Sequence, residues 1–477
     1  MRLDNRYATF AWAGAKVTPS PLRDPQLLLL NSELAEQLGI HLSQTQWRDL
    51  VSGHWLAPEM SPFAQVYAGH QFGGFSPQLG DGRAMLLGEV IAPNNQRWDL
   101  HLKGAGKTPF SRFGDGRAVL RSSLREYLAS EALHHLGIPT TRALALVGSN
   151  EPVYREQTES GAGLLRAAPS HLRFGHFEYF YYQKQPEHIP TLLDYLIDTQ
   201  WPELTKDATG YAALFARVVE KTAELIAKWQ LVGFCHGVLN TDNMSMLGLT
   251  LDYGPYGFLD AYDPDHICNH SDSGGRYAYD QQPAVGLWNL QRLAQALSGV
   301  IALESLQAAL SHYEQQLMGA YSAGLRHKLG LVSWQAGDPE LFRDMFTLMA
   351  AQKVDYTNWF RQLAQLTVKG EMPAQLLALL SEPAAGVAWL TRYQQRLAEE
   401  NIEHQVKVAQ MNSVNPKYIL RNHLAQQAIE KAEQGDMAEA DRLLMVLARP
   451  FAEQPEYEAY AQSAPSWARD LTISCSS

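Results

Sequence analysis

Apolar positions along the chain follow two spacings, and each spacing predicts one kind of element. Trp98, Leu100 and Leu102 alternate with polar residues, which is typical of a strand. Strand-like segments lie at residues 84–91, 98–103, 143–147 and 163–167. Residues 121–136 instead carry an apolar residue at every fourth position, so we predict a helix that ends before Gly137.

Helical periodicity dominates the remainder of the chain. We predict further helices at residues 26–38, 211–231, 287–297 and 418–447. Strands with one helix therefore come first and helices follow, which indicates a two-lobed α+β fold. The expected divisions are an N-terminal extension (1–60), a lobe with glycine-rich loops (61–165), a helical lobe (166–345), and a helical extension with a cysteine-containing tail (346–477).

Composition narrows the class of protein. With 477 residues, 46% of them hydrophobic and 19% charged, the chain has the composition of a globular protein. Its net charge of −11 argues against a nucleic-acid partner. It has no apolar run of about 18 residues and no hydrophobic leader at Met1, so we expect no membrane association. Three cysteines make no disulfide scaffold, which favours a cytoplasmic location.

The segment from His236 to Asn243, followed by an Asp-Tyr-Gly motif at Asp252, resembles the catalytic loop and metal motif of protein kinases. In this alignment the catalytic aspartate of kinases is replaced by Val238, which cannot accept a proton. Asn243 and Asp252 offer the hard oxygen ligands that Mg²⁺ prefers, and Asp242 beside them can act as a base. The pattern indicates nucleotide chemistry other than ordinary phosphorylation.

The pentapeptide Gly-Asp-Gly-Arg-Ala occurs twice, at residues 80–84 and 114–118. Glycines let the backbone approach a phosphate closely, and successive N–H groups can then bind the anion. Arg83 and Arg117 would add positive charge. The alternative interpretation is two Asp-Gly turns with solvated arginines.

Lys103 ends a predicted strand, where a kinase-like fold holds its phosphate-binding lysine. Such a lysine needs an acidic partner on the following helix, and Glu126 and Glu131 are the candidates. We predict Glu126, because it lies in the first half of that helix, near the glycine loop. Residues 106–108 imitate the end of a P-loop, but the first glycine of that motif would be His101, so we disfavour a P-loop.

Three further groups of residues are candidates for chemistry. Local sequence favours surface positions for Arg166 and Arg173, and phosphate recognition is the alternative. The spacing of His266, Cys268 and His270 does not match structural zinc sites. Cys475 lies in the terminal Ser-Cys-Ser-Ser and is a candidate redox partner of Cys268, whereas Cys235 adjoins the catalytic loop and is the weaker candidate.

Together these motifs resemble the selenoprotein O family, and the resemblance runs from residues 71–75 to the Cys-Ser-Ser tail. Cys475 stands at what resembles the selenocysteine position of animal members, so the chain resembles the cysteine-containing members. The resemblance implies a kinase-like two-lobed fold that binds ATP in reversed orientation. It further implies transfer of AMP to Ser, Thr or Tyr hydroxyls of proteins.

Carried over position by position, the resemblance also implies a site. Asn243 and Asp252 would hold Mg²⁺ or Mn²⁺, Asp242 would accept the proton, and Glu126 would pair with Lys103. The implied nucleotide contacts are Gly80, Gly82, Arg83, Lys103, Asp115, Gly116, Arg166, Arg173 and Asp252.

Three alternative functions stay open at this point: uridylyl transfer from UTP with Mn²⁺, a kinase that uses Asp242 as its base, and a scaffold that binds nucleotide without catalysis. For the leading interpretation the expected partners are ATP and proteins with Ser, Thr or Tyr acceptors. We expect a monomer that is cytoplasmic in a bacterium and mitochondrial in a eukaryote.

Overall fold

An antiparallel sheet of eight strands forms the N-terminal part of the protein, which a computed structural model describes over residues 1–471. In spatial order its strands are β1 (Gly14–Lys16), β3 (Phe63–Gln65), β6 (Ala84–Ile91), β7 (Arg97–Lys103), β10 (Thr158–Ala168), β9 (Arg142–Tyr154) and β2 (Gln26–Leu30), while β8 (Ala118–Val119) pairs with β10. The four strands predicted from the sequence lie within β6, β7, β9 and β10. Both ends of this order, β1 and β2, come from the first 60 residues.

Helices cover both faces of this sheet. Successive strand residues point to opposite faces, so Leu164 packs with α3 (Leu120–His135), whereas Leu165 packs with α1 (Ser32–Gln37) and α2 (Gln44–Val51). Because each face is buried, the sequences of the central strands are nearly continuous runs of apolar residues. The predicted helix at 121–136 is α3, displaced by one residue.

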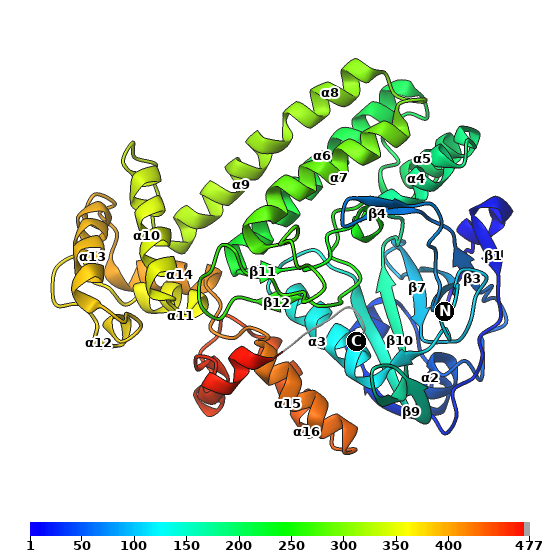
Figure 1. Ribbon diagram of the computed structural model, residues 1–477, viewed down its shortest axis with the longest axis horizontal. Helices are drawn as coiled ribbons and strands as arrows, with labels where there is room; N and C mark the ends of the chain where they lie inside the picture. Colours follow the sequence, from blue (N-terminus) through cyan, green and yellow to red (C-terminus); the bar gives the residue numbers. More distant parts are fainter. Residues whose placement is uncertain (472–477) are drawn as a thin grey trace.

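The helical part of the chain begins after the sheet (Figure 1). Its helices are α4 (Phe174–Tyr182), α5 (Ile189–Gln200), α6 (Ala208–Val232), α7 (Gln282–Leu297), α8 (Leu303–Ser311), α9 (Tyr313–Lys328), α10 (Asp338–Gln352), α11 (Tyr356–Leu363), α12 (Ala374–Leu377), α13 (Pro383–Ala398), α14 (His404–Val414), α15 (Asn422–Glu433) and α16 (Ala438–Leu447). Within residues 1–471, none of the helices has the length and apolar character needed to cross a bilayer.

The long helix α6 leads into the kinase-like loop, which begins at His236. It ends at Gly233, whose φ of 72° is the left-handed conformation that glycine adopts without strain. The chain then enters β11 (Phe234–Cys235), which pairs with β12 (Gly257–Phe258). The loop between these two short strands contains all of the residues that resemble the kinase catalytic loop and metal motif.

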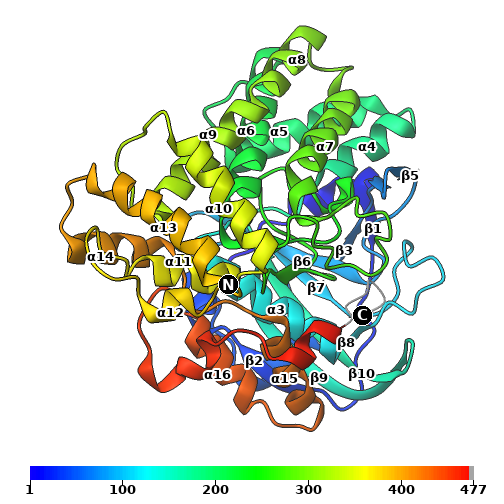
Figure 2. The same ribbon diagram turned by 60° about the vertical axis from the view of Figure 1, so that its left-hand side comes forward.

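The last helices return to the sheet. Both views show α15 and α16 beside α3 (Figures 1 and 2), and side chains of all three helices share one hydrophobic core. The Arg125 guanidinium of α3 donates to Asn422 Oδ1 of α15 at 2.8 Å. The C-terminal helices therefore support the helix that carries Glu126.

Two predicted helices differ from the structure. The prediction at 26–38 is wrong in its first half, because residues 26–30 form β2 and a helix begins only at Ser32. A run of four leucines has no helical or strand period, and pairing with β9 decides the outcome. The segment 418–447 forms two helices, because Gly435 takes a φ of 85° between α15 and α16.

Arg421 ties the C-terminal helices to the segment after β12. Its buried guanidinium donates to Asp260 (2.7 Å) and to Asp355 (3.1 Å). We expect Arg421→Met to lower the free energy of unfolding by about 3 kcal/mol, because it leaves two carboxylates without their cation. Differential scanning calorimetry measures this. The control Arg392→Met breaks an exposed pair with Asp344 and should cost less than about 1 kcal/mol; equal losses would contradict the prediction.

Candidate active site

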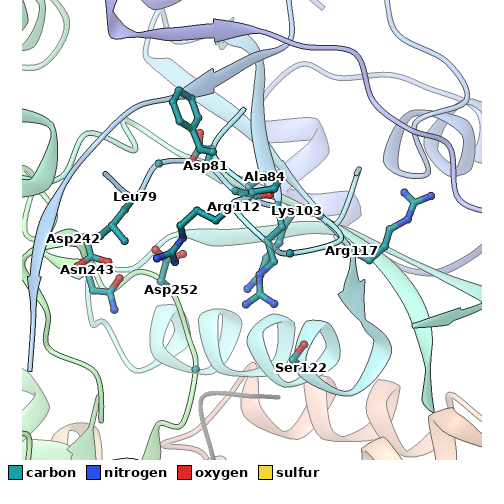
Figure 3. Close-up of a pocket in the computed structure, with 18 of the residues that line it drawn as sticks. Leu79, Asp81, Ala84, Lys103, Arg112, Arg117, Ser122, Asp242, Asn243 and Asp252 are labelled. Atoms are coloured by element: carbon teal, nitrogen blue, oxygen red, sulfur yellow. The ribbon is translucent and has the colours of Figure 1, made fainter. Parts of the chain in front are cut away.

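A cavity of about 760 Å³ opens beside the kinase-like loop. Its lining includes two glycine-rich segments (79–84 and 110–117), residues of β7 and β10, and the loop between β11 and β12 (Figure 3). Eleven of the predicted site residues line it: Gly80, Gly82, Arg83, Lys103, Asp115, Gly116, Arg166, Arg173, Asp242, Asn243 and Asp252. Glu126 lies behind Lys103. The structure thus brings together residues that are up to 172 positions apart (80 to 252).

Charged side chains form a network on one wall of the cavity. Lys103 Nζ lies 2.5 Å from Glu126 Oε2. Arg166 Nη1 donates to Glu126 Oε1 (3.1 Å) and to Asp252 Oδ1 (2.8 Å), and Arg173 forms an ion pair with the other oxygen of Asp252. Three cations thus face two carboxylates, so the network carries one excess positive charge and favours an anionic ligand.

Electrostatics keep both carboxylates ionised. Burial raises the pKa of Asp252, but Arg173, Arg166 and Lys103 outweigh burial and hold this pKa well below its usual value. Burial also raises the pKa of Glu126, while Lys103 and Arg166 lower it by more. Asp252 has a φ of 59°, in the left-handed region, which Asp and Asn occupy more readily than most residues. This backbone conformation helps to aim its carboxylate at the arginines.

The pairing of two strands brings the basic residues together. Lys103 and His101 are two residues apart on β7 and therefore share a face. In the register with β10, Lys103 lies opposite Leu164, and His101 lies opposite Arg166. Arg166 thus projects from the same face of the sheet as Lys103, toward α3 and Glu126.

The loop after β11 presents oxygen atoms to the cavity. The Asn243 side-chain NH₂ donates to Val238 O at 2.9 Å, which leaves the amide oxygen of Asn243 available. Asp242 accepts from Gln71 Nε2 at 3.1 Å through Oδ2, whereas its Oδ1 has no hydrogen-bond partner among the described residues. Burial raises the pKa of Asp242 to about 7, although Gln71 and Arg173 lower it. A carboxylate with this pKa is suited to accept a proton near neutral pH.

A short hairpin contacts the loop after β11 and helps to position it. It consists of β4 (Gly69–Gln71) and β5 (Gly74–Ser76), and the backbone N–H of His70 donates to Thr241 Oγ1 at 2.7 Å. A Cβ on Gly69 would lie 2.5 Å from Asp242 Oδ1, so only glycine permits this approach. The hairpin also supplies Gln71, whose amide holds Asp242.

The two Gly-Asp-Gly-Arg copies have different roles. In the first, Gly80 takes a φ of 96°, and Arg83 lines the cavity with no carboxylate at ion-pair distance in the described chain. In the second, Asp115 pairs with Arg155, while Arg117, at the edge of the cavity, pairs with Glu151 and points away from Lys103 and Asp252 (Figure 3). Only the first copy therefore offers a free arginine to a phosphate.

Local sequence was a poor guide to the two arginines after β10. Taken alone, it favoured surface positions for Arg166 and Arg173, and this is wrong, because they are only 4% and 1% exposed. Their charges are stabilised by Asp252, which lies far along the chain. Arg173 also stacks over the Tyr67 ring at 4.8 Å, which the sequence could not indicate.

Other residues of the site escaped the sequence reasoning. Gln71, Asp81, His101 and Arg112 line the cavity or contact its charged residues. The signal for His101 was present, because its two-residue spacing from Lys103 places both on one strand face. No local signal distinguishes Gln71 or Arg112 from ordinary surface residues.

Cys268 is buried beside Cys235, and their sulfur atoms lie 3.2 Å apart. Both cysteines are reduced in the structure. Burial raises the pKa of the Cys268 thiol well above its usual value, and the neighbouring Cys235 raises it further. The predicted partner, Cys475, lies outside the described residues.

Oxygen ligands for a divalent cation are present, but the protein supplies few of them. Asn243 Oδ1 and the Asp252 carboxylate fit Mg²⁺ or Mn²⁺, and a carboxylate can accept more bonds than the two arginines use. Within residues 1–471, no cluster of three or more His, Cys, Asp or Glu side chains forms a complete metal cage. Such a donor set suits a cation that completes its coordination with substrate phosphates and water.

Comparison with known proteins gives consistent matches over the whole chain. A family model described as "Protein adenylyltransferase SelO" matches residues 9–448. The "Protein nucleotidyltransferase YdiU" of Aeromonas hydrophila is 62% identical, with 100% of both chains covered. Proteins of the same name from Myxococcus xanthus and Klebsiella pneumoniae are each 51% identical, and the matches cover 100% and 97% of this chain and 99% and 96% of theirs.

Proposed function

The chain belongs to the SelO family and is a protein nucleotidyltransferase, and we propose that it transfers AMP from ATP to Ser, Thr or Tyr hydroxyls of other proteins, releasing pyrophosphate. One observation carries the choice of reaction. Val238 stands where a kinase needs its base, while Asp242, four residues on, has a carboxylate oxygen without a hydrogen-bond partner among the described residues. The proton acceptor is therefore displaced from the position that serves transfer of the γ-phosphate.

The cations of the site explain which phosphorus reacts. In this proposal Lys103, Arg166 and Arg173 bind the β- and γ-phosphates, and Arg83 reaches the phosphate chain from the glycine loop. The α-phosphorus then faces the side of the cavity formed by Asp242. Backbone N–H groups around Gly80 and Gly82 complete the phosphate contacts. Asp115 and Gly116 lie at the rim formed by the second glycine segment, where the proposal has them contact the nucleotide.

The bonds change in one displacement. The acceptor hydroxyl oxygen attacks the α-phosphorus, the bond from this phosphorus to the bridging oxygen breaks, and pyrophosphate leaves. Asp242 takes the proton of the hydroxyl, and Lys103, Arg166 and Arg173 stabilise the charge on the leaving pyrophosphate. Glu126 holds Lys103 in place. A divalent cation held by Asn243 and Asp252 would neutralise phosphate charge when bound.

The proposed fold is a kinase-like pair of lobes. The order of the four elements supports it: a strand lysine, a helix glutamate, a loop ending in Asn243, and Asp252. We assign 61–165 to the first lobe and 166–345 to the second. The segments 1–60 and 346–477 are the additions at either end, although 1–60 contributes β1 and β2 to the sheet.

The reaction is tested with ATP labelled at the α- or the γ-phosphate, a protein acceptor and Mg²⁺. Label transferred from the α position alone is the expected result, with pyrophosphate released. Label from the γ position alone would make the protein a kinase, and binding of ATP without transfer would favour a scaffold. UTP labelled at the α-phosphate, with Mn²⁺, distinguishes uridylyl from adenylyl transfer.

Chelation provides a separate prediction. We expect EDTA to reduce AMP transfer by at least about 100-fold, because the phosphate charge would lose its largest neutralising group. Excess Mg²⁺ or Mn²⁺ should restore the rate. Calcium provides a control, because it binds carboxylates but has longer bonds and looser geometry. Full activity in EDTA would contradict the assignment of Asn243 and Asp252 as metal ligands.

A further inference from the structure

His101 is a buried residue beside the site that the proposed reaction does not use. Its side chain is fully buried on β7. Nδ1 lies 2.6 Å from Arg166 Nη2, and Nε2 lies 3.1 Å from Asp81 Oδ2. Both ring nitrogens therefore have partners, one on β10 and one in the first glycine-rich loop.

These contacts determine where the ring proton lies. An arginine guanidinium can only donate, so Nδ1 of His101 must be the acceptor and carries no hydrogen. The hydrogen then resides on Nε2 and is donated to Asp81, whose Oδ2 also accepts from the backbone N–H of Gln65 at 3.0 Å. Burial, together with the charges of Arg166 and Arg173, lowers the pKa of His101 by more than Asp81 raises it. The ring is thus neutral and holds one tautomer.

His101 completes the support of Arg166. Nη1 of the guanidinium contacts Glu126 and Asp252, and Nη2 contacts His101, whereas Nε is buried with no hydrogen-bond partner in the described chain. Without His101, Nη2 would lose the one contact that it has in the network. The guanidinium could then rotate about its contacts with Glu126 and Asp252.

The same contacts connect Arg166 to the glycine-rich loop. Asp81 is the aspartate of the first Gly-Asp-Gly-Arg copy, and its backbone oxygen accepts from Thr108 Oγ1 at 2.6 Å. The aspartate of the second copy, Asp115, pairs with Arg155 at the rim and has no histidine partner in the described part of the chain. Within residues 1–471 the two identical motifs therefore have different partners, His101 for Asp81 and Arg155 for Asp115.

We propose that His101 is a positioning residue: its Nδ1 fixes the orientation of Arg166 toward the nucleotide phosphates, and Asp81 fixes the ring by accepting from Nε2. The role rests on the proposed function, because it requires that Arg166 binds phosphate. It assigns the aspartate of the first glycine loop a structural reason for its presence. It also requires that His101 takes no part in proton transfer.

Kinetics of two variants test the role. His101→Leu removes both contacts and should raise KM for ATP about tenfold or more, with kcat changed less. The reason is that the charge-assisted hydrogen bond that orients Arg166 toward the phosphates is lost in the ground state and the transition state alike. His101→Asn places an oxygen where it can accept from Arg166, so most of the affinity should return. Loss of affinity in both variants alike would overturn the role of Nδ1.

His171 provides a matched control. Its buried ring stacks on His101 at 4.5 Å, and its ring nitrogens have no hydrogen-bond partner among residues 1–471, while Nδ1 lies 3.4 Å from Asp99 Oδ2. His171→Leu therefore makes the same chemical change one ring further from Arg166. We expect an unchanged KM for ATP, and a smaller fall in melting temperature than in His101→Leu, because no buried hydrogen bond is lost. Equal changes of KM in the two leucine variants would reduce His101 to a packing residue.

The tautomer can be measured without any substrate. In protein labelled with ¹⁵N-histidine, the ring signals that disappear in His101→Leu should show a neutral ring with hydrogen on Nε2 at pH 7. A hydrogen on Nδ1, or a doubly protonated ring, would overturn the inference whatever the enzyme does. If wild-type protein neither binds ATP nor transfers AMP, the proposed function fails, and this spectrum still decides the His101 arrangement.

Discussion

Asp252→Asn will reduce AMP transfer by about 1,000-fold or more. The carboxylate is proposed as a metal ligand and is also the partner of Arg166 and Arg173. The amide of asparagine has no negative charge, so it would bind the divalent cation that the reaction needs much more weakly. Asparagine is a better test than alanine, because Asp252 has a φ of 59° and asparagine adopts this left-handed conformation readily. The rate of transfer from α-labelled ATP at saturating Mg²⁺ measures the effect.

The loss should be one of catalysis and not of nucleotide binding, and the variant should also have a lower free energy of unfolding, because the buried Arg166 and Arg173 lose their carboxylate. Lys103, Arg166 and Arg173 remain in the variant, so ATP binding without metal, measured by calorimetry, should weaken by less than about threefold. Asp265→Asn is the control, since this exposed aspartate lies in the same segment after Asp252. Undiminished transfer by Asp252→Asn would rule out the proposed metal site.

The parts of the fold that could be predicted are those in which local pattern and tertiary packing agree. The alternating residues of β7 and the four-residue period of α3 each bury one face, so period and outcome coincide. Lys103 and Glu126 were paired correctly because one ends a strand and the other lies early in the next long helix. β2 was missed because its leucine run has no period, and its partner, β9, lies over 100 residues away.

The unpredicted parts of the site depend on neighbours that are distant in sequence. Arg83 and Arg117 stand in identical pentapeptides, yet within residues 1–471 only Arg117 forms an ion pair with a carboxylate, that of Glu151. Arg166 appeared to be a surface residue until the pairing of β10 with β7 placed it opposite His101. In each case the local sequence gives the chemistry of the side chain, and strand pairing decides whether it is buried, paired or free.

Asp242→Asn provides the second large effect, a fall in kcat of about 100- to 10,000-fold, because the amide cannot accept the proton of the acceptor hydroxyl. KM for ATP should change little, since the side chain contacts Gln71 and no cation. Gln71→Leu is the matched control: it removes the hydrogen bond that orients Asp242 but leaves the carboxylate, so only a several-fold loss is expected. An unchanged kcat in Asp242→Asn would exclude Asp242 as the proton acceptor.

The same substitution should not destabilise the protein, which separates it from a simple folding defect. Burial raises the pKa of Asp242 from 3.8 to about 7, so the ionised carboxyl opposes folding. This penalty is absent below about pH 4, where the carboxyl is protonated in both states, grows as the pH rises, and is complete above about pH 7. The melting temperature of Asp242→Asn should therefore exceed that of the wild type by a margin that widens from pH 4 to pH 7. A variant that is both inactive and less stable at pH 8 would indicate that Asp242 serves the fold and not the reaction.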